Sequence, residues 1–110
     1  MYEPALNWIE VFPGIHRRRL AASEQLYQME VRLEPESVVP LHQHPHEQTT
    51  YVVSGRLRVQ IGDEQIEAGP GSIARFPSNV PHAVWALEAS LVLDTFSPVR
   101  ADYLAADGDR

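Results

Sequence analysis

The chain has 110 residues, of which 44% are hydrophobic and 22% charged, a length and balance typical of one globular domain. Its net charge of −6 disfavours nucleic acid and anionic membranes as partners, and the absence of cysteine excludes disulfides and thiolate metal ligands. No apolar run is long enough for a transmembrane helix, and the first residues do not form a secretory signal. We therefore expect a cytoplasmic protein that binds neither nucleic acid nor membrane.

Frequent Pro and Gly divide the chain into short segments in which apolar and polar residues alternate, as in half-buried β-strands. The alternation separates Arg17 and Arg19 from Arg18, which favours a strand over a basic nucleic-acid patch. Turns at Ser54-Gly55 and Gly62-Asp63 predict hairpins on either side of one strand. In chain order we expect strands over 26–33, 48–54, 56–61, 72–76, 82–87 and 91–97, then a short helix or loose segment over 101–106.

Many short strands with Gly/Pro turns and no long helical segment between them predict an all-β fold, an antiparallel sandwich or barrel. A jelly roll fits the number of strands. The length predicts a single domain over residues 1–110.

Four of the five histidines fall in two places, His42-Gln43-His44-Pro45-His46 and His82. His42 and His44 are two residues apart on an extended segment, so their side chains leave the same face. Gln48 begins the next strand and can turn its amide oxygen toward the same point, and a strand pairing can add His82. Histidine on a strand is more often a packed or surface residue, so this pattern alone leaves both interpretations open.

A site of His42, His44, Gln48 and His82 would hold one divalent metal with four neutral ligands. The ion's charge would stay uncompensated and would attract a small anionic substrate. Such donors accept Ni, Zn, Mn, Fe or Co, so the residue types do not decide the metal. We leave His46 outside the ligand set because Pro45 interrupts the strand regularity, and its role stays open.

The motif spacings resemble those of the cupin superfamily. The first cupin motif matches within 40–55, through His42, His44, Gln48 and Gly55, with Gln48 in place of the usual Glu. The second matches within 69–86, through Gly71, Pro77, Asn79 and His82; Asn79 replaces a Gly, an exchange tolerated in the left-handed region. The resemblance implies a cupin jelly-roll barrel, an antiparallel double-stranded β-helix, with the metal inside its mouth and often a dimer.

A closer resemblance covers nearly the whole chain. It is similar to small cupins of pectin and alginate breakdown that linearise 4,5-unsaturated uronates, which share the segment 42–48 and a tail of the form D-x-F-x-P-x-R, here 94–100. This resemblance implies that Gln48, Asp94, Phe96 and Arg100 are active-site residues. Asp94 and Arg100 would act in catalysis with Gln48, and Phe96 and Arg100 would contact the substrate.

The tail has its own physical interpretation. Val92, Asp94 and Phe96 share one face of the last strand, and Leu91 and Leu93 share the other. Asp94 is either a buried carboxylate with satisfied hydrogen bonds or, facing a metal pocket, a general acid or base. Arg100 is either a surface residue or a fork for a substrate carboxylate, and Phe96 is either core or a wall of the site.

We predict a metal-dependent, isomerase-like enzyme that opens the ring of 4,5-unsaturated uronates and ketonises the product to a linear keto-sugar acid. The alternatives are a cupin-type metal-dependent dioxygenase and a non-catalytic module that binds a small molecule. The outward residues Leu91 and Leu93 need cover, so we also expect a homodimer formed through the sheet.

Overall fold

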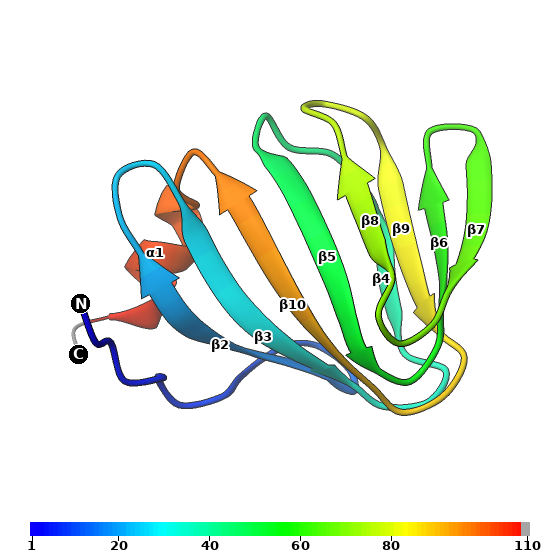
Figure 1. Ribbon diagram of the computed structural model, residues 1–110, viewed down its shortest axis with the longest axis horizontal. Helices are drawn as coiled ribbons and strands as arrows, with labels where there is room; N and C mark the ends of the chain where they lie inside the picture. Colours follow the sequence, from blue (N-terminus) through cyan, green and yellow to red (C-terminus); the bar gives the residue numbers. More distant parts are fainter. Residues whose placement is uncertain (109–110) are drawn as a thin grey trace.

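The computed structural model describes residues 1–108, which form two antiparallel sheets and one short helix (Figure 1). In the six-stranded sheet the order is β1-β2-β3-β10-β5-β8, and in the four-stranded sheet it is β4-β9-β6-β7. The strands are β1 (Ile9–Phe12), β2 (Ile15–Ala22), β3 (Tyr27–Leu33), β4 (Val38–His42), β5 (Glu47–Ser54), β6 (Leu57–Ile61), β7 (Glu64–Ala68), β8 (Ile73–Phe76), β9 (His82–Ala86) and β10 (Ser90–Ser97). The helix α1 (Ala101–Asp107) lies at the end of the molecule away from β6 and β7.

The strands predicted over 26–33, 48–54 and 91–97 are confirmed as β3, β5 and β10, along which buried residues alternate with more exposed ones. On β10, Val92, Asp94 and Phe96 point inward and are buried, as predicted. The alternation on β2 also holds, because Arg17 and Arg19 are buried and Arg18 lies on the opposite face. Burial of these apolar faces between the sheets forms the core, which includes Tyr27, Val52, Leu57, Val59, Phe76, Val92 and Phe96.

The hairpin prediction is right at one turn and wrong at the other. β6 pairs with β7 across Gly62 and Asp63, with Ile61 opposite Glu64. The turn at Gly55 instead carries the chain from β5 in one sheet to β6 in the other. Gly55 has a φ of +91°, and a Cβ there would lie 2.2 Å from the Ser90 hydroxyl oxygen. A close crossing over the start of β10, rather than a hairpin, therefore requires this glycine.

Two strand pairings place the site. β4 pairs with β9 so that His42 lies opposite His82, at one end of the four-stranded sheet. β10 lies between β3 and β5 in the other sheet, with Asp94 opposite Thr50 and Phe96 opposite Gln48. Within the described residues, no helix is long and apolar enough to cross a membrane. The cytoplasmic location expected from the sequence stays a prediction.

Candidate metal centre

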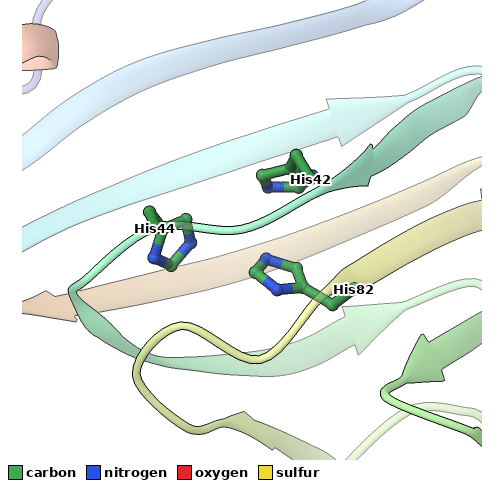
Figure 2. Close-up of side chains that lie close together, drawn as sticks. All are labelled: His42, His44 and His82. Atoms are coloured by element: carbon green, nitrogen blue, oxygen red, sulfur yellow. The ribbon is translucent and has the colours of Figure 1, made fainter.

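Three histidines converge between the sheets. Figure 2 shows His42 at the end of β4, His44 in the loop that follows, and His82 at the start of β9, with their rings facing a common space. Their candidate ligand atoms all lie within 4.8 Å of one another. The His42 and His82 ring centroids are 4.2 Å apart, and those of His44 and His82 are 4.9 Å apart.

Backbone carbonyls determine which nitrogen of each ring carries the proton and which has a lone pair. The Nδ1–H groups of the three rings donate to the carbonyls of residues two positions away, Pro40, His46 and Val80, at 2.7, 2.9 and 2.9 Å. A carbonyl oxygen only accepts, so the ring proton sits on Nδ1 and the lone pair on Nε2. This is the arrangement that orients metal-binding histidines in proteins.

The Nε2 lone pairs of His82 and His44 face no hydrogen-bond donor within residues 1–108. The Nε2 of His82 is buried, and no hydrogen-bond partner for it exists among residues 1–108. The Nε2 of His44 lies 3.0 Å from Oε1 of Gln48, and with the His44 proton on Nδ1 both atoms are acceptors. Acceptor atoms that face one another with no shared proton are costly unless a cation lies between them. The three histidines could therefore hold a divalent ion, and the Gln48 amide oxygen lies beside them as a further candidate donor.

Burial favours the neutral forms of His44 and His82. Burial lowers the pKa of the His82 imidazole to about 4, and it also lowers the pKa of the His44 imidazole. A metal ligand must be in its neutral form, so both rings are ready to coordinate at neutral pH. Their buried position between the sheets thus favours metal binding before any ion arrives.

A line of three buried polar side chains leads away from the histidines. The amide Nε2 of Gln48 donates to the Thr50 hydroxyl at 3.1 Å, and that hydroxyl donates to Oδ1 of Asp94 at 2.6 Å. Burial raises the pKa of Asp94 to about 6, against the lowering effect of these hydrogen bonds. Sequence reasoning did not select Thr50, although the alternation along β5 places it on the same face as Gln48.

Arg100 is buried rather than a surface residue. Its guanidinium lies 3.8 Å from the centroid of the Tyr103 ring and 4.8 Å from that of Phe96. Its Nε and Nη2 donate to the two carboxylate oxygens of Asp102 at 3.0 and 2.8 Å, and these bonds lower the pKa of Asp102 to about 2. Asp102 and Tyr103 immediately follow the tail motif, but only the structure shows that they hold Arg100.

A cavity of about 60 Å³ connects these groups. Its lining includes His42, Gln48, His82, Asp94, Phe96 and Arg100 together with apolar residues from both sheets. Three of the four predicted ligands and the predicted tail residues thus line one cavity, and His44 does not line it. Phe96 lies under Arg100 and 5.6 Å from the His44 ring, between centroids, so it packs as core and also borders the site.

His46 lies beside the site and outside the group of three histidines. Its ring is 5.5 Å from that of His44, and its backbone carbonyl orients the His44 ring. The backbone of His46 therefore has a defined function in the site, whereas the function of its side chain stays open.

Comparison with known proteins defines the class. The model of the cupin domain matches residues 29–95, which is more than half of the chain, and the chain therefore belongs to the cupin family.

Within that family the chain is a homologue of the pectin degradation protein KdgF. The KdgF protein of Dickeya dadantii (strain 3937) is 34% identical over 99 residues, which cover 88% of this chain and 90% of that protein. The solved structure of KdgF from Halomonas sp. has a TM-score of 0.85 and 37% identity, over 88% of this chain and 90% of that one. This likeness supports the jelly-roll arrangement of the two sheets.

The oxalate decarboxylase OxdC of Bacillus subtilis (strain 168) is 37% identical over 76 residues. The match covers 64% of this chain but only 20% of that enzyme, so the chain corresponds to about a fifth of its length. Together these relatives indicate an enzyme of the cupin family.

Proposed function

We propose that this chain converts cyclic 4,5-unsaturated uronates into linear keto-sugar acids by ring opening and ketonisation. The observation that carries the proposal is the shared cavity, in which a buried acid (Asp94) and a buried guanidinium (Arg100) border a cluster of neutral metal ligands. The homologue from Dickeya dadantii is named for pectin degradation, and uronates are the sugar acids of pectin, which supports this substrate class.

The chemistry requires a group that both accepts and returns a proton. Opening the hemiacetal removes the proton of the anomeric hydroxyl and breaks the bond between the anomeric carbon and the ring oxygen, which leaves an aldehyde and an enolate. Ketonisation then places a proton on the neighbouring carbon, so no atom is gained or lost overall. Asp94, with its pKa raised to about 6 by burial, can accept the first proton and supply the second near neutral pH.

Substrate orientation would depend on Arg100. A guanidinium carries five N–H donors, and Asp102 takes two of them, so Arg100 keeps other donors for a substrate carboxylate. The Phe96 and Tyr103 rings both pack against the guanidinium and restrict its plane, so the remaining donors have a defined direction. We place Phe96 as the apolar wall beside the bound ring.

A divalent ion held by His42, His44, Gln48 and His82 would supply Lewis acidity and an attraction for the anionic substrate, because none of these ligands carries a compensating charge.

The test is a spectrophotometric assay with unsaturated galacturonate. Metal-loaded protein should remove the absorbance of the conjugated double bond faster than the spontaneous rate, and a chelator should abolish the acceleration. Asp94→Asn should lower kcat by about 100-fold or more. Arg100→Gln should raise KM. Asp63→Asn and Arg58→Gln, the same changes at exposed positions, are the matched controls.

Other outcomes would overturn the proposal in different ways. An Asp94→Asn protein that keeps its metal and its full rate would remove Asp94 from the reaction. No acceleration with any of several metals would exclude the uronate reaction. Metal-dependent oxygen uptake would then indicate a dioxygenase, and stabilisation by a small molecule without turnover would indicate a binding module.

A homodimer is part of the same proposal. The outer face of the six-stranded sheet exposes Tyr51, Val53 and Ile73, beside the half-buried Leu91 and Leu93. Tyr51 lies opposite both Ile73 and Leu93 across the sheet, so these side chains form one apolar surface. Ile73→Glu should dissociate the dimer in sedimentation experiments, and a wild-type chain that sediments as a monomer would contradict the proposal.

A further inference from the structure

We propose that Thr50 is a positioning residue of the metal centre, which holds the Gln48 amide with its oxygen toward the metal and its nitrogen away. The proposal rests on the metal site and is independent of the uronate reaction. Its evidence is the direction of each hydrogen bond in the line from Gln48 to Asp94.

The backbone register places the three side chains in that line. Gln48 and Thr50 are two residues apart on β5 and therefore share its inner face. Thr50 lies directly opposite Asp94 on the neighbouring strand β10. All three side chains are buried, with exposed fractions of 7%, 4% and 8%, so water is not a ready substitute for any of them.

The Thr50 hydroxyl has a single proton, and it uses this proton to donate a hydrogen bond to the Asp94 carboxylate. The 2.6 Å contact between Thr50 Oγ1 and Asp94 Oδ1 uses that proton, because a carboxylate only accepts. The hydroxyl oxygen is then left as an acceptor, and it accepts from Nε2 of Gln48. The donors therefore run in one direction, from amide to hydroxyl to carboxylate.

On the Thr50 side of the amide, this direction of donors disfavours the reversed orientation. If the Gln48 amide turned over, its oxygen would face a hydroxyl whose proton is already used, and two acceptors would meet. Its NH₂ group would then point at the lone pair of His44 Nε2 and could donate to it, which would compete directly with a metal ion. Thr50 thus keeps the lone pairs of Gln48 Oε1 and His44 Nε2 available for a metal ion.

The substitution Thr50→Val tests this most directly, because it removes the hydroxyl and keeps the shape of the side chain. The probe is Co²⁺, added to metal-free protein and followed by visible absorption, which reports both affinity and the set of donor atoms. We expect Thr50→Val to weaken Co²⁺ binding by roughly 10- to 100-fold, the effect typical of losing an outer hydrogen bond to a ligand. The absorption spectrum should also change, because the Gln48 amide oxygen would no longer be held among the donor atoms of the site.

Three matched proteins separate positioning from a general structural effect. Thr50→Ser retains the hydroxyl and should restore wild-type affinity and spectrum. Thr49→Val makes the same change on the outer face of β5 and should leave both unchanged. Thr50→Val in a Gln48→Ala background should have no further effect on affinity, because the amide that Thr50 holds is absent. Thr50→Ala serves as a second hydroxyl-free variant if the valine variant does not fold.

Wild-type affinity and spectrum in both hydroxyl-free variants would overturn the inference, and so would an undiminished loss of affinity in the Gln48→Ala background. Absence of saturable Co²⁺ binding by the wild-type chain would overturn it together with the metal site. Failure of the uronate assay with normal Co²⁺ binding would instead affect only the proposed function.

Discussion

Two largely buried clusters of polar groups differ in how their members are paired. The first is the histidine cluster, which consists of His42, His44, Gln48 and His82. The second is a clamp between β2, β3 and α1, formed by Arg17, Tyr27 and Asp107. The Nη1 of Arg17 donates to both Asp107 Oδ1 and Tyr27 Oη at 2.8 Å. The Tyr27 hydroxyl donates to the second carboxylate oxygen of Asp107.

The clamp is nearly complete in itself, whereas the histidine cluster is not. In the clamp a buried cation meets a buried anion, with exposed side-chain fractions of 2% and 1%, although the buried Nε of Arg17 has no hydrogen-bond partner within residues 1–108. In the histidine cluster, lone pairs face one another without a donor. Satisfied buried pairs stabilise a fold, whereas an excess of buried acceptors favours the binding of a cation.

Removing one histidine should have the largest effect. We expect His82→Leu to weaken Co²⁺ binding by more than about 100-fold, beyond the effect of losing an outer hydrogen bond. Metal at 100 times its Kd should stabilise the wild-type chain by about 2.7 kcal/mol, and this gain should vanish in the variant. Thermal melting with and without metal measures it. Because the lost Nε2 has no partner in the metal-free protein, the metal-free variant should melt near the wild-type Tm.

Breaking the clamp should produce the opposite pattern. Asp107→Ala leaves the Arg17 guanidinium buried without its anion, which typically costs about 3–5 kcal/mol. Urea unfolding should show this loss, while Co²⁺ affinity measured below the transition stays at the wild-type value. Glu67→Ala removes an exposed pair with Arg56 and should change stability by about 0–1 kcal/mol. Equal stability of the two variants would show that the clamp contributes little.

The pH dependence of the unfolding free energy of the metal-free protein should distinguish the titration of Asp94 from that of the histidines. The pKa of Asp94 is about 6 in the fold and 3.8 ordinarily, so between these pH values the folded state binds more protons, and stability falls as pH rises. The pKa of His82 is about 4 instead of 6.5, so the unfolded state binds more protons there, and stability falls as pH falls. In the wild-type chain the two effects oppose each other between pH 4 and 6.

Asp94→Asn removes only the first effect. Its stability relative to wild type should therefore rise between pH 4 and 7.5, by about 3 kcal/mol for a shift of roughly two pH units. Urea unfolding at several pH values, with chelator present, measures this difference. A difference that does not change with pH would mean that burial does not raise the pKa of Asp94.

The smallest effect is expected at the edge of the site. Asp102 is mostly exposed, and Asp102→Asn leaves one acceptor where Arg100 now has two. Stability should change by less than about 1 kcal/mol, while KM for unsaturated galacturonate rises because Arg100 is less firmly oriented. Steady-state kinetics and thermal melting on the same preparation distinguish the change in KM from the change in stability. An unchanged KM would limit Asp102 to a surface role.

Much of the site followed from local patterns. Inward and outward faces of β3, β5 and β10 could be predicted because side chains alternate strictly along a strand. The left-handed conformation of Asn79, with φ of 61°, was also expected from its place in a turn where a Gly is usual. The role of Gly55 was misjudged, because a glycine before a strand is equally consistent with a hairpin and with a crossing between sheets.

The sequence by itself determined the donor atoms, their spacing along the strands and the faces on which they lie. Only the tertiary structure decided which strands pair, and therefore that His82 meets His42, that Thr50 joins Gln48 to Asp94, and that Arg17 meets Asp107 from 90 residues away. The physical reason is that periodicity encodes the face of a strand but not its neighbour. The direction of each lone pair depends further on backbone carbonyls, whose positions are set by the folded chain around them.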